Sequence, residues 1–283
     1  MNDSQLFNSI HNCEPWQDSF EESLRAHKFL EPKKAWGNLI TLSSQSNFQQ
    51  LFPEFFKSFI KLIGSSYHPD LALHNFERFA QTINDKNYLY TILSTSPESL
   101  KSIIVLFSGS QILTDSLLSD PSFFDWINNS KIINNSRSKD EFMRAYYKFS
   151  GEKYLDNRTP QILRKFKKRE YIRIGLRDLL GKTDFEETGR DLSFLADLSL
   201  QVAYEYVDQK MKEKYGVPYY KENNKEKKEV EFAVLGMGKL GGLELNYSSD
   251  IDLMYIYTSS KGQTHTTEDY PNTISISIHE YFT

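Results

Sequence analysis

The sequence predicts an α+β protein in which a mainly helical array, residues 1–220, precedes the first part of a small sheet, residues 221–283. Two observations support this. Apolar residues recur at helical spacing through most of the chain up to residue 214, and short Ser, Asn, Pro and Gly segments separate the repeats. Two runs rich in aromatic and β-branched residues, 232–235 and 251–257, then enclose a glycine-rich turn, which indicates two strands.

The helical segments are short, and most of their boundaries fall at turn-forming residues. Pro32 and Gly37 are expected to break the chain after the first helix, and Pro97 fits the first turn of a later one. The polar segment 128–140 is expected to be a loop, and Gly181 to end a long helix. The expected helices are 18–30, 46–63, 69–83, 88–94, 98–107, 110–118, 121–127, 141–149, 161–180 and 184–214.

The helix expected at 161–180 carries an apolar stripe and many cations on its other faces. These cations are Arg164, Lys165, Lys167, Lys168, Arg169, Arg173 and Arg177. The functional interpretation is a contact for phosphate or for an acidic protein surface. The structural one is a solvated face whose arginines pair with Glu170 and Asp178. Both interpretations stay open at this point.

The C-terminal part is expected to contain little regular structure outside the two strands. The charged segment 219–228 is expected to be a turn at the domain boundary, and 259–272 a surface loop. The last residues, 273–282, resemble the first turns of a helix. No strand is expected after Tyr257, so the sheet would have two strands.

The turn between the two strands contains the residue types of a phosphate and metal site. Glycines at this density let backbone N–H groups approach an anion closely, and Lys239 adds a positive charge. Asp250 and Asp252 lie two apart at the head of the second strand and would share one face, with Ile251 turned to the core. Paired carboxylates suit Mg²⁺ or Mn²⁺. The predicted nucleotidyl-transfer site therefore uses Asp250 and Asp252 as catalytic and metal ligands, with phosphate or nucleotide contacts at Gly236, Gly238, Lys239, Gly241, Gly242, Ser248 and Ser249.

Three other interpretations of this motif are weaker. An isolated Asp-x-Asp is usually a solvated turn, but here an apolar strand follows it directly. The glycines match the dinucleotide fingerprint, yet that fingerprint needs its acidic residue about twenty positions on, after the next strand. A phosphate-loop NTPase is excluded by spacing, because no glycine precedes Gly181-Lys182-Thr183 at the required position.

The string GMGKLGGLELNYSSDIDL resembles the signature of the glutamine synthetase adenylyltransferase family, whose members attach AMP to a tyrosine of glutamine synthetase and remove it. ELNYSSDID is more similar to the adenylyl-removing copy of the catalytic domain than to the adenylylating copy. Residues 162–207 and 106–127 also resemble helical segments of the family. The resemblance covers most of residues 90–258, and residues 1–60 cannot be placed.

The resemblance implies the first half of a nucleotidyltransferase palm of the polymerase-β type. It implies that phosphate attacks the tyrosine-linked AMP and releases ADP, with Mg²⁺ (or Mn²⁺) held by Asp250 and Asp252, and with ATP, ADP and phosphate as small-molecule substrates. Gly238 and Lys239 would contact phosphates, and Ser248 and Ser249 would shape the turn or touch the nucleotide. The implied partners are glutamine synthetase and a PII-type signalling protein. Leu243 departs from the family pattern, where a small or basic residue is expected.

A third carboxylate, which such palms carry on a later strand, has no obvious candidate: Glu268 and Asp269 lie in the expected loop and Glu280 on a short helix. We therefore expect the chain to be an N-terminal piece of a longer enzyme. The alternative is a binding module of the same family that docks glutamine synthetase or a PII-type regulator without catalysis. A third class is an unrelated nucleotidyltransferase of the toxin–antitoxin or antibiotic-modifying type, which would lack ELNYSSDID.

Composition and charge restrict the partners and the location that we expect for the protein. A formal charge of −4 argues against general nucleic-acid binding, and a single cysteine, Cys13, excludes an internal disulfide. The first residues lack a basic region followed by an apolar core, and no apolar run approaches the length of a membrane span. The expected location is the cytoplasm, without nucleic-acid or membrane partners.

Overall fold

The computed structural model describes residues 3–44, 48–151, 155–222 and 226–283. The chain divides into two compact units, one formed by Met1–Asn135 with Tyr171–Asp184 and the other by Ser136–Glu170 with Phe185–Thr283. The boundary expected near residue 220 does not coincide with this division, and it stays a prediction about domains.

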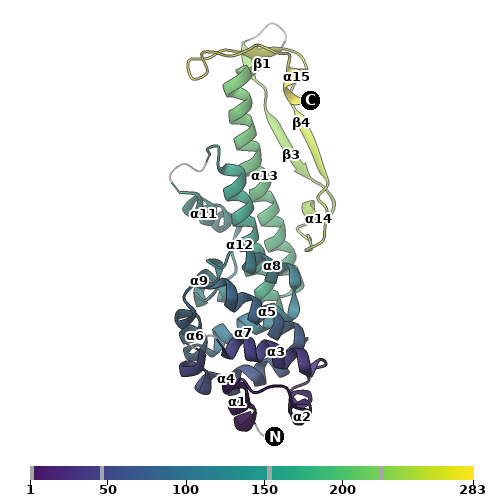
Figure 1. Ribbon diagram of the computed structural model, residues 1–283. Helices are drawn as coiled ribbons and strands as arrows, with labels where there is room; N and C mark the ends of the chain where they lie inside the picture. The colour runs from purple at the N-terminus through teal and green to yellow at the C-terminus, as the bar shows by residue number, and fades with distance from the viewer. Residues whose placement is uncertain (1–2, 45–47, 152–154, 223–225) are drawn as a thin grey trace. The chain divides into compact units, whose positions relative to one another are not determined.

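The first unit consists of short helices (Figure 1). Its apolar centre is rich in phenylalanine; the rings of Phe59 and Phe76 lie 4.7 Å apart, and those of Phe79 and Phe107 5.5 Å apart. The helices in the described part of this unit are α1 (Asp3–His11), α2 (Ser19–Ala26), α3 (Pro32–Ser43), α4 (Phe48–Gly64), α5 (Pro69–Thr82), α6 (Lys86–Thr95), α7 (Pro97–Gly109), α8 (Gln111–Ser119), α9 (Phe123–Ile127), α10 (Ser130–Asn134) and the second half of α12 (Thr159–Leu179).

The expected helical array is confirmed, and three local predictions in it were wrong. Helix α1 was missed. Pro32 does not break the chain but occupies the first turn of α3, where its missing N–H costs nothing. In the segment expected to be a loop, Asn129 accepts a hydrogen bond from the backbone of Lys131 and so caps the short helix α10. The beginning of the helix expected at 46–63 lies outside the described residues.

Helix α12 does not carry one solvated basic face. Arg173 and Arg177 are buried in the first unit, and Arg177 donates to the carbonyl of Ile133 at 2.9 Å. In the second unit, Arg169 lies over the ring of Phe149 at 4.3 Å and within 3.7 Å of the buried Glu170. These three arginines therefore have structural roles. The expectation of a solvated face was wrong for Arg173 and Arg177, which are buried.

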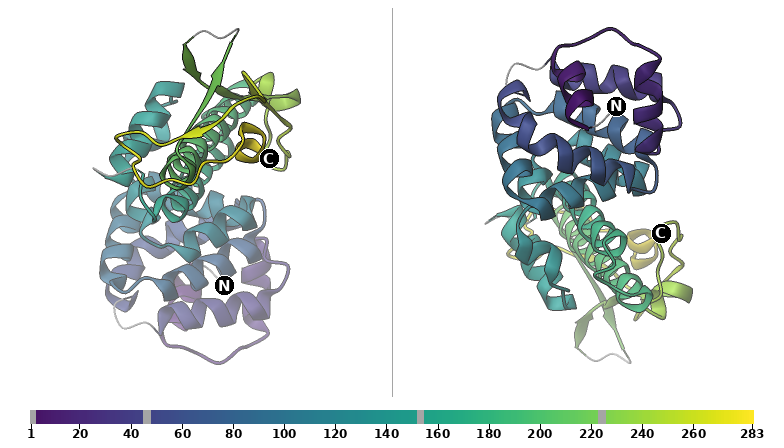
Figure 2. Two further views of the ribbon diagram at one scale, coloured as in Figure 1. Left: turned by 90° about the horizontal axis from the view of Figure 1, so that it is seen from above. Right: turned by 90° about the horizontal axis from the view of Figure 1, so that it is seen from below.

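The second unit is organised along the long helix α13 (Phe185–Tyr215). The remaining elements in the described part of this unit are α11 (Lys139–Ser150), the first half of α12, β1 (Val217–Lys221), β2 (Lys227–Glu229), β3 (Phe232–Gly236), α14 (Gly238–Gly241), β4 (Leu253–Tyr257), β5 (Gln263–His265) and α15 (Ile278–Phe282). The strands form two antiparallel sheets, one in the order β2-β1-β5 and one of β3 and β4. In Figure 2 the β1–β2 hairpin projects clear of the helices.

The three-stranded sheet corrects the prediction for the C-terminal region. Segment 219–228 is mostly a hairpin instead of a turn, and β5 is a strand after Tyr257, inside the expected loop. Both were missed because these short strands have no apolar alternation, and β2 is charged and exposed throughout. Strand β5 pairs with β1 and not with β4, and it carries no carboxylate. The helix expected at 273–282 is restricted to α15.

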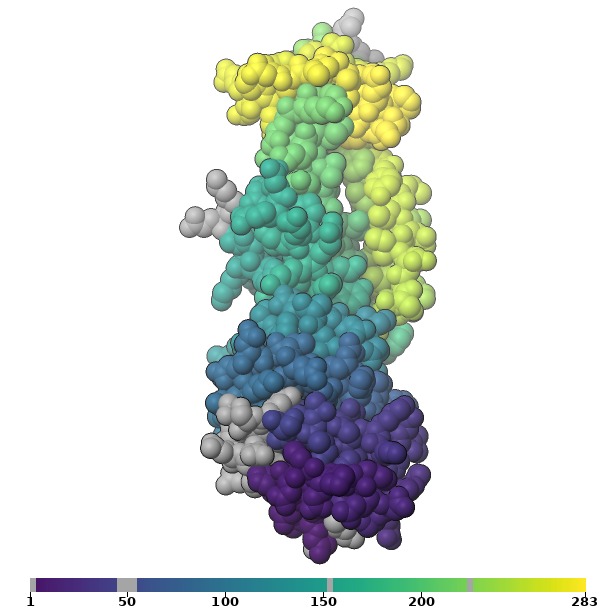
Figure 3. Space-filling view, viewed as in Figure 1, coloured from purple at the N-terminus to yellow at the C-terminus, as the bar shows by residue number. Residues whose placement is uncertain are grey.

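The β3–β4 hairpin has two different faces. On the face toward α13, Phe232 stacks on Tyr204 of that helix at 5.3 Å and on Phe282 of α15 at 5.3 Å. The opposite face carries apolar side chains that remain exposed, including Leu235 (43%) and Met254 (48%). Aromatic stacking on one face thus attaches the hairpin to the helix, and the other face stays open to solvent (Figure 3).

Candidate functional site

One residue of the aspartate pair, Asp252, lies against the glycine turn. Strand β3 ends at Gly236, the backbone N–H of Met237 donates to the carbonyl of Asp252 at 2.9 Å, and α14 begins at Gly238. Gly238 has a φ of +54°, and a Cβ there would lie 3.5 Å from Oδ2 of Asp252. The carboxylate of Asp252 therefore lies close to the backbone of the turn, and the positive φ of Gly238 is what favours glycine there.

Two of the other glycines serve the packing of the turn itself. A Cβ at Gly241 would lie 2.6 Å from the carbonyl oxygen of Gly236, and one at Gly236 would meet the side chain of Leu240 at 2.8 Å. Gly242, with a φ of −83°, has no neighbour that close. The turn thus needs Gly236 and Gly241 for its own compactness, and their predicted contacts with phosphate stay a prediction.

The charged side chains of the turn are exposed to solvent. Within the described residues, the side chains of Lys239, Asp250 and Asp252 have no hydrogen-bond or ion-pair partner. The first N–H groups of a helix also lack acceptors within it. The turn segment therefore carries an exposed cation, Lys239, and two exposed carboxylates, Asp250 and Asp252.

One detail of the aspartate pair differs from the prediction. Strand β4 begins at Leu253, so both aspartates precede the strand instead of opening it. Ile251 is 40% exposed and does not turn into a core. The reason is that the hairpin has no covered layer behind this position, because its aromatic contacts with α13 lie farther along the strands, at Phe232.

The segment between the glycines and the aspartates is a closed turn. Oδ1 of Asn246 accepts hydrogen bonds from the backbone N–H of Ser248 at 3.2 Å and from the hydroxyl of Ser249 at 2.6 Å. The hydroxyl of Ser249 in turn accepts from the N–H of Asn246 at 3.2 Å. Of the two roles expected for these serines, shaping the turn is the one that these contacts support.

Helix α13 positions this turn through residues that sequence reasoning missed. The hydroxyl of Ser193 donates to the carbonyl of Gly189 at 2.8 Å and accepts from the buried N–H of Leu245 at 3.3 Å. A Cβ at Gly189 would lie 3.3 Å from the Cα of Glu244, so the two backbones touch. A glycine and a serine four residues apart inside a long helix were the available signal, since neither is a strong helix former.

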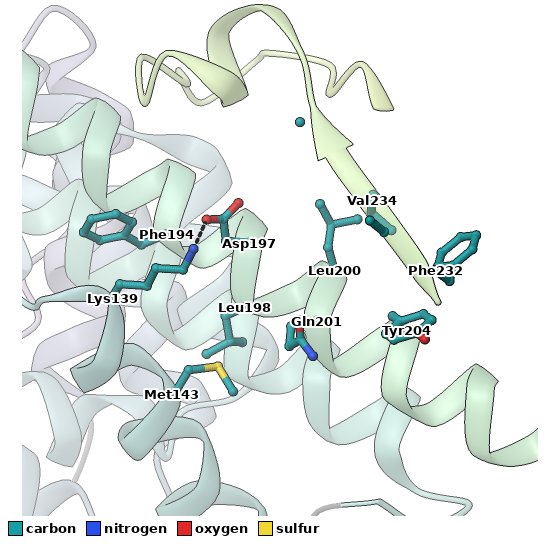
Figure 4. A pocket seen from close by; sticks show the side chains of 12 residues that line it. Lys139, Met143, Phe194, Asp197, Leu198, Leu200, Gln201, Tyr204, Phe232 and Val234 are labelled. Atoms are coloured by element: carbon teal, nitrogen blue, oxygen red, sulfur yellow. Dashed lines mark hydrogen bonds and ion pairs between the residues drawn. The ribbon is translucent and has the colours of Figure 1, made fainter. Parts of the chain in front are cut away.

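A pocket also lies next to β3. A pocket of about 480 Å³ lies between α11, α13 and β3 and is lined by Lys139, Asp197, Gln201, Tyr204 and Phe232 among others (Figure 4). Lys139 and Asp197 form an ion pair across it at 2.6 Å. Gly236, at the end of β3, also lines this pocket, whereas Lys239, Asp250 and Asp252 do not.

The donor chemistry of the aspartate pair fits a hard divalent cation, because two unpartnered carboxylates lie beside a turn that suits phosphate. In the part of the chain that the structure describes, no group of three or more His, Cys, Asp or Glu residues could hold a metal. Two protein ligands and substrate oxygens would have to complete the coordination.

The chain is mainly helical and carries a strand, a glycine turn and an aspartate pair directly before a second strand, residue types that suit phosphate and a divalent cation. The family model described as glutamate-ammonia ligase adenylyltransferase matches residues 100–278, more than half of the chain. The chain belongs to this family.

Individual relatives agree with this assignment. The chain is similar to proteins named bifunctional glutamine synthetase adenylyltransferase/adenylyl-removing enzyme: from Nitrosococcus oceani (30% identity, 66% of this chain and 19% of the relative), Shewanella woodyi (31%, 64% and 18%) and Pseudomonas aeruginosa (44%, 34% and 9%). The chain thus spans less than a fifth of each of these relatives.

Among the described helices, none is by itself long and apolar enough to cross a membrane. Helices α7 and α8 have the required length and apolar composition only when taken together, and the chain bends by 119° between them.

Proposed function

We propose that this chain carries part of a nucleotidyltransferase site that acts on glutamine synthetase and removes AMP from a tyrosine of that enzyme by phosphorolysis, releasing ADP. The observation that carries the proposal is the position of the Asp252 carboxylate over Gly238, beside the exposed Lys239. Family membership and the names of the relatives support the choice of glutamine synthetase as the substrate. A PII-type signalling protein is the proposed regulator, and the cytoplasm the proposed location.

In this proposal each residue of the turn has a separate task. Lys239 and the N–H groups of α14 bind phosphate oxygens, and Asp250 and Asp252 hold Mg²⁺ or Mn²⁺. When bound, the cation would polarise the reacting phosphorus and offset charge on the attacking and leaving oxygens. The Asn246–Ser249 turn fixes the direction in which the aspartates project.

The test is the phosphate-dependent release of ADP from adenylylated glutamine synthetase, measured with the intact gene product that contains this chain. Asp252→Asn should abolish the release, and Asp269→Asn, an exposed acid away from the turn, should leave it unchanged. A binding readout accompanies activity: Mn²⁺ titration of the 283-residue chain, followed by electron paramagnetic resonance, should show a site that Asp252→Asn weakens. Retained phosphorolysis in Asp252→Asn would refute the assignment.

A second candidate is a binding module that docks glutamine synthetase or a PII-type protein without catalysis. The observation that favours it is the pair of exposed cations Arg164 and Lys168 on α12, which suits an acidic protein surface. Mn²⁺-dependent nucleotide binding by the chain would argue against this candidate. Tight binding of glutamine synthetase by a chain that binds no metal and no nucleotide would support it.

A further inference from the structure

A second group of cationic side chains lies on the three-stranded sheet, away from the glycine–aspartate site. Lys221 of β1 lies directly opposite Lys227 of β2, and His265 of β5 lies opposite Val217 of β1. Because alternate residues share a face, these side chains project from the same side of the sheet as Tyr219. Nζ of Lys227 is 3.5 Å from Nδ1 of His265, and the His265 and Tyr219 rings are 5.9 Å apart.

This arrangement is electrostatically unfavourable when no anion is present. Two like charges directly opposite each other on neighbouring strands destabilise a sheet. Partial burial and then the charges of Lys227 and Lys221 lower the pKa of His265 below its ordinary value. The sheet therefore concentrates positive charge at one place and keeps the histidine from adding to it.

The nearby carboxylates do not neutralise this charge. Glu229, which shares the face, accepts from Lys212 of α13 at 2.8 Å, and Glu222 pairs with Lys228 at 3.4 Å. In the described part of the chain, neither Lys221 nor Lys227 has a carboxylate partner. Glu226, next to Lys227 in the chain, forms no ion pair with either lysine in the part of the chain that the structure describes.

Protection of a sheet edge explains only part of this pattern. Lysines on edge strands prevent edge-to-edge association, and Lys227 lies on the edge strand β2. Lys221, however, lies on β1, the central strand of the sheet, where edge protection requires no charge. Its position opposite Lys227 needs another explanation.

We propose that Lys221, Lys227 and His265, the Lys–Lys–His cluster, bind a phosphate group, either free or carried by a nucleotide. A phosphate offers three acceptor oxygens and a charge of about −1.5 to −2, which matches three cationic donors better than a carboxylate with two oxygens does. Binding relieves the repulsion between the lysines and favours the protonated imidazole. This site goes beyond the proposed catalytic function, since it lies on a different sheet from Asp250 and Asp252.

The test is the pKa of His265, followed by NMR of the 283-residue chain with the other histidines as internal controls. Sulfate is the first probe because its charge does not change between pH 5 and 8, and sodium chloride at equal ionic strength is the control. Sulfate should raise the pKa of His265 by about one unit, because a nearby anion favours the charged imidazole. An equal effect of chloride would overturn the proposal.

Variants separate a specific site from general screening. Lys221→Gln and Lys227→Gln should each raise the pKa of His265 in the absence of an anion, because each removes a nearby positive charge. This rise would show that the sheet of the variant is folded. Each variant should also reduce the further rise in pKa that sulfate causes. Lys228→Gln, which removes a lysine paired with Glu222, should leave the rise unchanged. Inorganic phosphate and AMP are then compared. An effect of either one supports a phosphate site and identifies its source, whereas no effect of both, or a full effect in Lys221→Gln and Lys227→Gln, overturns it.

Discussion

At the scale of single residues, the turn depends on one glycine more than on the others. Gly238 has a left-handed backbone and faces the carboxylate of Asp252, while Gly242 has an ordinary backbone, and a Cβ there would make only ordinary contacts, the nearest at 3.6 Å. The glycines of the turn therefore differ in how strongly its backbone conformation depends on them.

This difference makes Gly238→Ala and Gly242→Ala a matched pair. We expect Gly238→Ala to lower the free energy of unfolding by about 1–2 kcal/mol, because alanine is strained at positive φ. Gly242→Ala should be neutral or stabilising by up to about 1 kcal/mol, because it reduces the entropy of the unfolded chain. Urea denaturation followed by circular dichroism measures both. Equal effects would mean that the turn does not have this backbone conformation in solution.

At the scale of elements, helix α13 is the support on which the hairpin and the turn rest. Phe232 anchors the hairpin through its contacts with Tyr204 and Phe282, and Ser193 anchors the turn through Leu245. The two anchors lie at different ends of the contact and can be tested separately.

The aromatic anchor is tested by Phe232→Ala against Leu235→Ala. Both residues are on β3, but Phe232 stacks on α13 and Leu235 lies on the exposed face. Phe232→Ala should destabilise the hairpin by roughly 2–3 kcal/mol, somewhat less than a fully buried phenylalanine, and Leu235→Ala by less than about 1 kcal/mol. Hydrogen exchange of the β3 and β4 amides gives the readout, and equal protection in both variants would contradict the packing described above.

The polar anchor is tested by Ser193→Ala against Ser199→Ala. Both hydroxyls donate to a carbonyl four residues earlier in α13, at 2.8 Å and 2.7 Å, but only Ser193 also accepts from Leu245. Loss of a partner for a buried N–H costs about 1–3 kcal/mol. Ser193→Ala should therefore speed hydrogen exchange at Leu245, and Ser199→Ala should not. A similar rate in the two variants would show that the turn is held by other contacts.

At the scale of the whole molecule, charge is distributed unevenly along the chain. Segment 136–170 contains eleven Lys and Arg residues against five Asp and Glu, a formal charge of +6, in a chain whose total is −4. Part of this charge is paired, but in the described part of the chain Arg164 and Lys168 on α12 are exposed and have no partner. They keep open the role of a contact for an acidic protein surface.

We expect the double variant Arg164→Gln with Lys168→Gln to bind glutamine synthetase more weakly and with a smaller dependence on salt, because two exposed cations no longer attract the partner. Its free energy of unfolding should stay within about 0.5 kcal/mol of the original. Lys57→Gln with Lys61→Gln is the matched control, as these exposed lysines of α4 are also one helical turn apart. The affinity for glutamine synthetase is measured by surface plasmon resonance. An equal loss of affinity in both double variants would exclude a specific role for α12.

Local patterns determined much of this protein. The spacing of apolar residues predicted most helices of the first unit, and the two apolar runs around the glycines predicted β3 and β4, because burial of one face imposes a period that is visible in sequence. The same patterns brought Gly238, Lys239 and Asp252 together, since a short turn between paired strands leaves little freedom of placement.

Other features were decided only by the tertiary structure. Strands β1, β2 and β5 are short and carry no apolar alternation, and the pairing of β1 with β5 joins residues more than forty positions apart. Arg173 and Arg177 resemble surface residues until neighbouring helices bury them. Ser193 supports the turn across 52 positions of sequence, and the Lys–Lys–His cluster forms from three strands. Long-range contacts of polar groups have no local period, and for that reason the sequence alone could not show them.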